Sequence, residues 1–281
     1  NVIFDTISAE GTASGGGVIG AYGDTIIRGS TFNNNSTNYI GGAIYVKNVD
    51  LRVFDTIFTN NTARIRGGAI HFSGDGLIFG STFDKNQTTS SHGGAIANEA
   101  NLHISDSTFT NNSTAMTTAT YGGAVYNASN LTVSGSTFTN NAVPNILATD
   151  TTAEIMGAGG AIYNGKNLAV NNSVFTGNSA TEDAGGALLS RHALFVSSSI
   201  FGETGNGNTA ANNGGAIYIS PSSFAKASII NSTFTENTAK DRGGAIYAGK
   251  DLTVNSSVCT MTLLTEQQTV RELFPTTRLT I

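Results

Sequence analysis

The chain has 281 residues, of which 34 are Gly and only 12% are charged, against roughly 25% in an average globular protein. Its net charge of −5 at pH 7 argues against a nucleic-acid-binding protein, and its single Cys excludes an internal disulfide. With 39% hydrophobic residues the chain can build a folded core, yet no apolar stretch approaches the roughly 18 residues of a membrane helix.

A repeat of Gly-Gly followed by small or branched apolar residues runs through the chain. It begins nine times, at Gly16, Gly41, Gly67, Gly93, Gly122, Gly159, Gly185, Gly214 and Gly243. The unit is about 26 residues long, and the longer spacings indicate loop insertions that keep the phase. Residues Ile3 to Ile7 match part of a unit, so we expect the chain to enter the repeat partway through a coil.

Each unit contains three short runs in which apolar and polar residues alternate. In the unit that begins at Gly122 these runs are AVY, LTV and STF, separated by Gly, Asn and Ser. A period of two with turn residues between the runs predicts three short strands, and no helical period competes. The sequence therefore predicts an all-β solenoid: a single-stranded parallel β-helix of nine to ten coils stacked about 4.8 Å apart.

Aligned units place identical residues in columns, which a parallel stack turns into ladders. The inward Phe ladder is expected to contain Phe32, Phe58, Phe83, Phe109, Phe138, Phe175, Phe201 and Phe234. Three residues later, the Asn ladder is expected to contain Asn35, Asn61, Asn86, Asn112, Asn141, Asn178 and Asn237. Thr204 and Thr262 replace Asn in this column, so we expect the regular stack to weaken there. The Gly pair is typical of a tight corner with positive φ or close backbone approach.

The pairing of Gly-Gly-Ala-(Ile/Val/Leu) with Phe-x-x-Asn resembles the repeats of chlamydial polymorphic outer membrane proteins. It is also similar to the adhesin-like surface proteins of gut bacteria and methanogenic archaea. The resemblance covers Gly16 to about Thr262. It implies a right-handed parallel β-helix that is secreted and displayed on the cell surface as an adhesive passenger, with a glycan or protein of a host or neighbouring cell as its partner.

The composition changes after residue 262, which predicts a β-helix over residues 1–262 and a cap or tail over residues 263–281. Thr265-Glu-Gln-Gln matches a capping box and predicts a short helix that ends before Pro275. A disordered tail or the start of another domain is the alternative. The closing Leu279-Thr-Ile matches a strand of the repeat and could complete the first coil of another copy, which would give a fibre assembled head to tail.

One predicted outward column, directly after Gly-Gly-Ala-Ile, is rich in Tyr. Five of the eight Tyr of the chain lie in it, namely Tyr45, Tyr126, Tyr163, Tyr218 and Tyr247, and His71, Ala97 and Leu189 fill other coils of the same column. Such a stripe could bind sugar rings or a protein, because a Tyr ring has an apolar face and a polar tip. Alternatively, the ring ladder only stabilises the sheet.

Polysaccharide lyases and hydrolases share this fold class and need carboxylates that converge on an outer face. Two outward columns, six residues before the Phe and directly before it, contain no acid. Turn positions account for Asp50, Asp55, Asp106 and Asp251. Only loop acids such as Glu182, Asp183 and Glu203 remain for an enzyme, so the sequence favours a protein without enzymatic activity.

The sequence predicts neither a metal nor a cofactor. His71, His92, His103 and His192 fall in different columns or loops without metal-ligand spacing, and we expect them at the surface. Cys259 lies in the Phe column, which predicts a small buried side chain. An extracellular adhesin-like module is therefore the leading hypothesis, and a subunit of a surface fibre or a polysaccharide-active enzyme are the alternatives.

Overall fold

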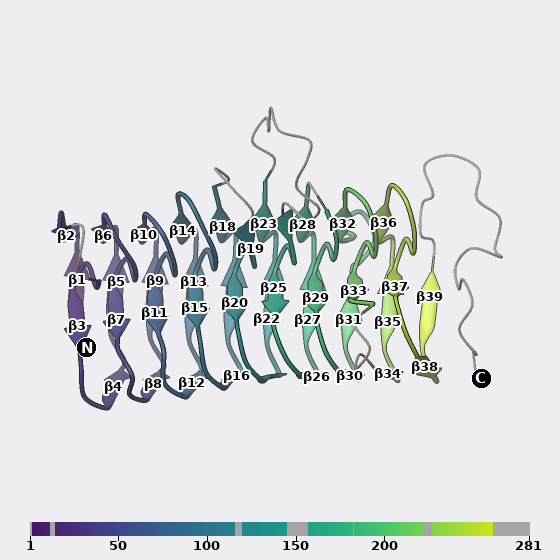
Figure 1. Cartoon of the computed structure of the whole chain (residues 1–281), viewed down its shortest axis with the longest axis horizontal. Helices are drawn as coiled ribbons and strands as arrows, with labels where there is room; N and C mark the ends of the chain where they lie inside the picture. The colour runs from purple at the N-terminus through teal and green to yellow at the C-terminus, as the bar shows by residue number, and fades with distance from the viewer. Residues whose placement is uncertain are drawn as a thin grey trace.

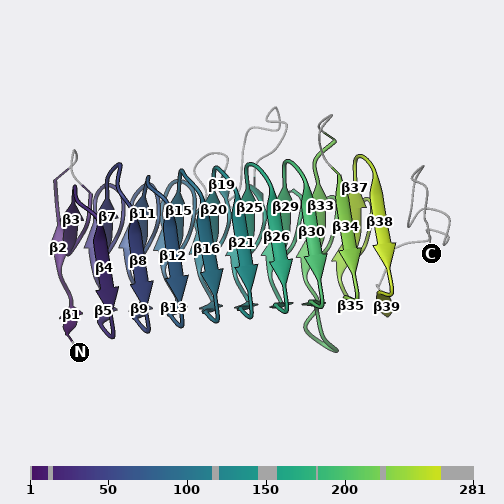
Figure 2. The ribbon, with the colours of Figure 1, turned by 90° about the horizontal axis from the view of Figure 1, so that it is seen from below.

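The computed structural model describes residues 2–11, 15–115, 120–144, 157–181, 183–221 and 226–260. These residues form a parallel β-solenoid without any helix, as Figures 1 and 2 show from two sides. The predicted all-β solenoid is confirmed. The expected cap helix and the closing strand at 279–281 lie outside the described residues. Within the described part of the chain, no helix has the length and hydrophobicity to cross a membrane.

Each coil contributes one strand to each of four parallel sheets. The strand after Gly-Gly joins the nine-stranded Tyr sheet: β3 (Ile19–Ala21), β7 (Ile44–Val46), β11 (Ile70–Phe72), β15 (Ile96–Asn98), β20 (Val125–Asn127), β25 (Ile162–Asn164), β29 (Leu188–Ser190), β33 (Ile217–Ile219) and β37 (Ile246–Ala248). The next strand joins the nine-stranded Val sheet: β4 (Thr25–Arg28), β8 (Leu51–Phe54), β12 (Gly76–Phe79), β16 (Leu102–Ser105), β21 (Leu131–Ser134), β26 (Leu168–Asn171), β30 (Leu194–Ser197), β34 (Ala227–Ile230) and β38 (Leu252–Asn255).

The third strand of each coil joins the ten-stranded Phe sheet: β1 (Ile3–Asp5), β5 (Thr31–Asn33), β9 (Ile57–Thr59), β13 (Thr82–Asp84), β17 (Thr108–Thr110), β22 (Thr137–Thr139), β27 (Val174–Thr176), β31 (Ile200–Phe201), β35 (Thr233–Thr235) and β39 (Val258–Thr260). Its first strand, β1, pairs in register with β5, which confirms that residues 3–5 match this part of the repeat.

A fourth strand of two residues follows the Asn ladder and forms the nine-stranded short sheet: β2 (Ser8–Ala9), β6 (Ser36–Thr37), β10 (Thr62–Ala63), β14 (Gln87–Thr88), β18 (Ser113–Thr114), β23 (Ala142–Val143), β28 (Ser179–Ala180), β32 (Thr209–Ala210) and β36 (Thr238–Ala239). The expectation of three strands per coil was wrong. A two-residue strand turns only one side chain inward, so it produces no alternation that a sequence pattern can reveal. A separate pair, β19 (Thr120–Tyr121) with β24 (Gly157–Ala158), lies beside the Tyr sheet.

The core of the solenoid is a continuous stack of Phe rings. The rings of neighbouring coils lie 4.6 to 5.0 Å apart and nearly parallel from Phe32 to Phe234, and Phe4 adds one more ring at 4.8 Å. This separation matches the roughly 4.8 Å spacing of hydrogen-bonded strands, so strand pairing sets the ring spacing. Cys259 pairs with Phe234 in the same column but is exposed, contrary to the expected burial, because its strand β39 is the edge strand of the described Phe sheet.

The Asn ladder is an unbroken chain of side-chain amides in the described coils. Asn208 fills the position expected to be vacant at Thr204, and it donates from Nδ2 to Oδ1 of Asn237 at 2.8 Å. It also accepts from Nδ2 of Asn178 at 2.9 Å. The weakening expected at Thr204 does not reach the Asn ladder, because four inserted residues shift the amide from position 204 to position 208 without loss of register. The Phe sheet is shortened in this coil as expected, since β31 has two residues where its neighbours have three.

The two Gly of each pair have different roles at the corner before the Tyr sheet. The first Gly has a φ between +62° and +85° in all nine units, a region that disfavours residues with a Cβ. The second Gly has the neighbouring coil against it: a Cβ on Gly123 would clash with the carbonyl oxygen of Gly160. Positive φ thus constrains the first Gly, and close approach of the next coil constrains the second.

Candidate ligand-binding face

The outer face of the Tyr sheet carries the predicted Tyr column. Its residues pair in register from coil to coil, in the order Tyr45, His71, Ala97, Tyr126, Tyr163, Leu189, Tyr218 and Tyr247. The residues on either side in each strand point inward, as with Ile44 and Val46, which are completely buried. Strand alternation therefore turns the whole column away from the core.

The column is not the evenly exposed stripe that the sequence suggested. Tyr163 is only 7% exposed and packs with Ala158, Ala184 and Leu189 in a second apolar cluster outside the main core. Tyr126 and Tyr218 are half-buried against this cluster. The central part of the face is thus covered by side chains of the protein itself, and Tyr163 is not presented to a ligand.

The side chains that cover the central Tyr belong to a neighbouring column, which contains the residue directly before each Gly-Gly. His92 stacks on Tyr126 at 4.8 Å and on Tyr121 at 4.9 Å between ring centroids. Tyr121 in turn stacks on Tyr163 at 4.6 Å, and Arg191 donates to the Tyr163 hydroxyl at 3.3 Å. Sequence reasoning missed His92 and Tyr121, because both follow loops of variable length and show no strand period.

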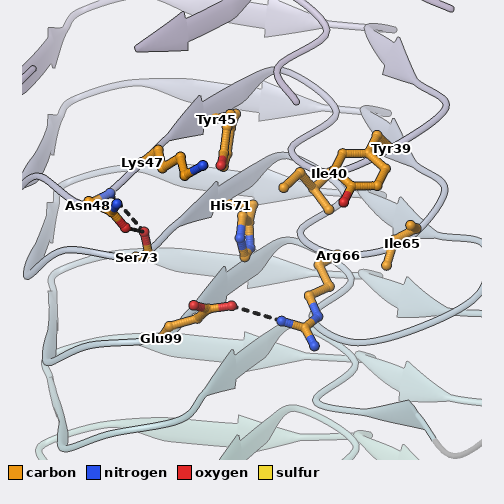
Figure 3. A pocket seen from close by; sticks show the side chains of 10 residues that line it. All are labelled: Tyr39, Ile40, Tyr45, Lys47, Asn48, Ile65, Arg66, His71, Ser73 and Glu99. Carbon is orange, nitrogen blue, oxygen red and sulfur yellow. Dashed lines mark hydrogen bonds and ion pairs between the residues drawn. The ribbon is translucent and has the colours of Figure 1, made fainter. Parts of the chain in front are cut away.

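The face opens into a groove of about 400 Å³ towards the N-terminal coils (Figure 3). The residues that line it are Tyr39, Ile40, Tyr45, Lys47, Asn48, Ile65, Arg66, His71, Ser73 and Glu99. Only Tyr45 among the five predicted binding Tyr lies in this groove. Tyr218 and Tyr247 stack on each other at 5.1 Å towards the other end of the sheet.

Two strands of the Tyr sheet, β7 and β11, provide the centre of the groove. The ring of Tyr45 stacks on the imidazole of His71 with the centroids 5.7 Å apart. Beyond His71, Arg66 reaches from the corner before β11 and pairs with Glu99 at 2.8 Å, as Figure 3 shows. This ion pair connects the corner before β11 to the residue after β15, and it bounds the groove on the side away from Tyr45.

A second outward column borders the groove two residues after the Tyr column. It contains Lys47, Ser73 and Glu99 in consecutive coils. The backbone N–H of each of these residues donates to a carbonyl of the preceding coil, so the parallel hydrogen bonding of the Tyr sheet extends to them. The hydroxyl of Ser73 accepts from the backbone N–H of Asn48 at 2.8 Å and donates to the Asn48 side-chain oxygen at 3.2 Å. The groove therefore combines an aromatic surface with a polar edge.

The two His near the groove are neutral at pH 7. Burial, together with the charge of Arg66, lowers the pKa of His71 from 6.5 to about 4, and the same causes lower that of His92 to about 4. His71 is 4% exposed, so its expected surface position was wrong, whereas His103 is exposed as expected. Since Arg66 and Glu99 neutralise each other, the groove carries a net charge of +1 from Lys47.

Burial also raises the pKa of several Tyr of this face, including Tyr45 and Tyr126. Burial raises the pKa of Tyr45, with contributions from the hydroxyls of Tyr22 and Tyr39 and from Glu99. Burial likewise raises the pKa of Tyr126. Both phenols therefore stay protonated well above neutral pH and can act as hydrogen-bond donors.

The loop acids considered for catalysis do not meet in this groove. Asp183 precedes β29, is half-buried and accepts from Nδ2 of Asn212 at 3.2 Å, and burial raises its pKa. Glu203 follows β31 at a different corner, is exposed and accepts from Asn206 at 3.3 Å. Glu182 lies outside the described residues. Among the residues that the structure describes, no three His, Cys, Asp or Glu side chains cluster as metal ligands.

Comparisons with known proteins agree with this architecture. A family model described as the right-handed beta helix region matches residues 16–201, and the Chlamydia polymorphic membrane protein repeat matches residues 231–249. No curated protein and no solved structure gives a significant match. Since the first match covers more than half of the 281 residues and the coils stack as parallel strands, the chain belongs to the right-handed β-helix family.

Proposed function

We propose that the chain is an adhesin-like module that is displayed on a cell surface and binds a glycan or protein of another cell through the groove of the Tyr sheet. The match of residues 231–249 to a polymorphic membrane protein repeat supports a surface location. The repeat pattern, similar to adhesin-like proteins of gut bacteria and methanogenic archaea, supports the same class of function.

The groove is the observation that carries the proposal. Its volume of about 400 Å³ falls within the range of roughly 300–1,000 Å³ typical of ligand pockets. Tyr39 and Tyr45 are half-buried, so each ring keeps an accessible part in the groove. Both rings sit on or beside strands of a rigid stack, which lowers the entropy lost when a ligand binds.

The side chain to test first is Tyr45, since its half-buried ring lines the groove and its removal leaves the core intact. We expect Tyr45→Ala to weaken attachment to cells, or to an array of immobilised glycans, by at least about tenfold, roughly 1.4 kcal/mol. Flow cytometry with labelled protein or a plate binding assay measures this loss. A thermal melt of each variant reports whether the fold is retained.

Tyr247→Ala is the matched control. Tyr247 occupies the same column and stacks on Tyr218 much as Tyr45 stacks on His71, but it lies outside the groove. We expect this variant to bind as the wild type does. Equal binding by Tyr45→Ala and wild type would show that the groove is not the attachment site.

A further inference from the structure

Lys47 is the one cation of the groove whose charge is not neutralised within the described part of the chain. It is exposed and lies two residues after Tyr45, so both side chains point out of the same sheet face. No described carboxylate forms an ion pair with it, although the described residues form four ion pairs, one of them between Arg66 and Glu99 in the groove itself. Figure 3 shows its amine on the Tyr45 side of the groove.

The other charged groups of the groove are already committed to each other. Arg66 and Glu99 are joined at 2.8 Å, which leaves neither charge fully available to a ligand. Glu99 lies two coils away from Lys47 in the same column, with Ser73 between them. A ligand that contacts Tyr45 therefore meets a positive charge, in a protein whose net charge is −5.

The polar edge next to Lys47 suits hydroxyl groups. Asn48 and Ser73 hold each other through two hydrogen bonds, and the Asn48 side chain is exposed. An amide and a hydroxyl held in place beside a partly exposed aromatic ring are suited to binding a sugar. The aromatic ring packs on the apolar face of the sugar, and the amide and hydroxyl form hydrogen bonds with the sugar hydroxyls.

We infer that the groove selects a carboxylated sugar, a hexuronate or sialate residue of a glycan, with the sugar ring on Tyr45 and its carboxylate on Lys47. The inference rests on the proposed function and adds the chemical class of the ligand. An acidic peptide would use Lys47 as well, but its flexible backbone offers no rigid apolar face for Tyr45. The flat ring surface and the paired Asn48 and Ser73 favour the sugar.

Isothermal titration calorimetry of the full chain tests the inference with two matched pairs of ligands. Trigalacturonate is compared with galactotriose, and 3′-sialyllactose is compared with lactose, so that the two pairs separate a hexuronate from a sialate source. We expect at least one carboxylated sugar to bind about tenfold or more tightly than its neutral partner. Its affinity should fall as the salt concentration rises, since an exposed charge pair is screened.

Variants then assign the preference to Lys47. We expect Lys47→Ala to bind the carboxylated and neutral sugars alike, and Lys47→Arg to keep most of the preference. Tyr45→Ala should lose affinity for both members of the pair. Lys250→Ala, which removes another exposed Lys far along the solenoid, is the control and should bind as the wild type does.

The outcomes separate the inference from the proposed function. Equal affinity for neutral and carboxylated sugars, or a preference that survives Lys47→Ala, would overturn the inference. Binding of a tri-glutamate peptide without any sugar binding would overturn it too. In each of these cases, cell attachment that depends on Tyr45 would leave the proposed function standing. Sugar binding without any Tyr45-dependent attachment would instead contradict the proposed function.

Discussion

The side-chain amide of each inner ladder Asn, from Asn61 to Asn208, makes a complete set of hydrogen bonds inside the protein. Oδ1 of Asn86 accepts from the backbone N–H and from Nδ2 of Asn61, at 3.0 and 2.9 Å. Its Nδ2 donates to the carbonyl of Phe58 and to Oδ1 of Asn112, at 2.9 and 3.0 Å. A buried amide is costly unless all of its groups are paired, and this geometry pairs them in every coil between the two end amides of the ladder.

His71 shows the opposite situation, because its Nδ1 is buried and makes no hydrogen bond in the described structure. Its pKa is about 4 in the folded protein, against 6.5 in the unfolded chain, so the unfolded chain takes up the proton first as the pH falls. The contribution of neutral His71 to the free energy of unfolding is therefore complete above pH 6.5, and it is lost progressively as the pH falls to about 4. The full loss is about 3 kcal/mol, since one pKa unit corresponds to roughly 1.4 kcal/mol.

We predict that His71→Phe flattens the decline in unfolding free energy between pH 6.5 and pH 4. Phe keeps an aromatic ring against Tyr45 but has no proton to gain. Urea melts at several pH values measure the decline for the variant and the wild type. His103→Gln, at an exposed position, is the control and should keep the wild-type slope. An unchanged slope in His71→Phe would show that another group causes the decline.

At the scale of the secondary-structure elements, the corner before each Tyr-sheet strand sets how closely the coils approach. The second Gly of a pair faces the carbonyl oxygen of the second Gly in the next coil, as with Gly123 and Gly160. The atoms in the way belong to the backbone, including Ala142 of the short sheet, so no side-chain rotation can relieve the clash.

We predict that Gly123→Ala destabilises the protein by about 3 kcal/mol or more, the upper end of the cost of overpacking. The added methyl would have to push two coils apart and weaken strand pairing on both sides. Gly23→Ala is the control, because a Cβ at this exposed turn meets no atom within 4 Å. Denaturant melts of the two variants should differ clearly, and similar midpoints would contradict the close approach at Gly123.

At the scale of the whole molecule, each coil contacts only the coils before and after it, so the stability of the solenoid is a sum over neighbouring pairs. The Phe stack runs through all of these pairs. Phe138 is completely buried and stacks on Phe109 at 4.6 Å and on Phe175 at 4.8 Å. A defect in this central coil weakens two neighbouring pairs at once.

We predict that Phe138→Ala lowers the unfolding free energy by about 3–5 kcal/mol, as expected when a large buried ring leaves a cavity. Phe195→Ala is the matched control, since Phe195 is 42% exposed on the outer face of the Val sheet, and it should cost less than about 1 kcal/mol. Chemical denaturation followed by circular dichroism compares the two. A loss under 1 kcal/mol for Phe138→Ala would mean that the Phe stack is not the main core.

The predicted columns could be recognised without a structure because residues that stack in space recur at a regular interval in the sequence. A residue such as Phe83 recurs at the same phase in every unit, and only a parallel stack with one coil per unit brings such residues together. The short sheet was missed because two residues are too few for a pattern. Asn208 was missed because an insertion of four residues hides its phase, although the register in space is unchanged.

The amino-acid sequence alone determined the coil, the inward ladders and the sheet face that carries the Tyr column, since these depend on residues within one repeat. The tertiary structure decided which part of that face is open. His92 and Tyr121 cover Tyr126 and Tyr163, whereas an ion pair between Arg66 and Glu99, 33 residues apart, ends the groove. These contacts join different coils through corner residues outside the strand period, so their positions depend on how the coils stack.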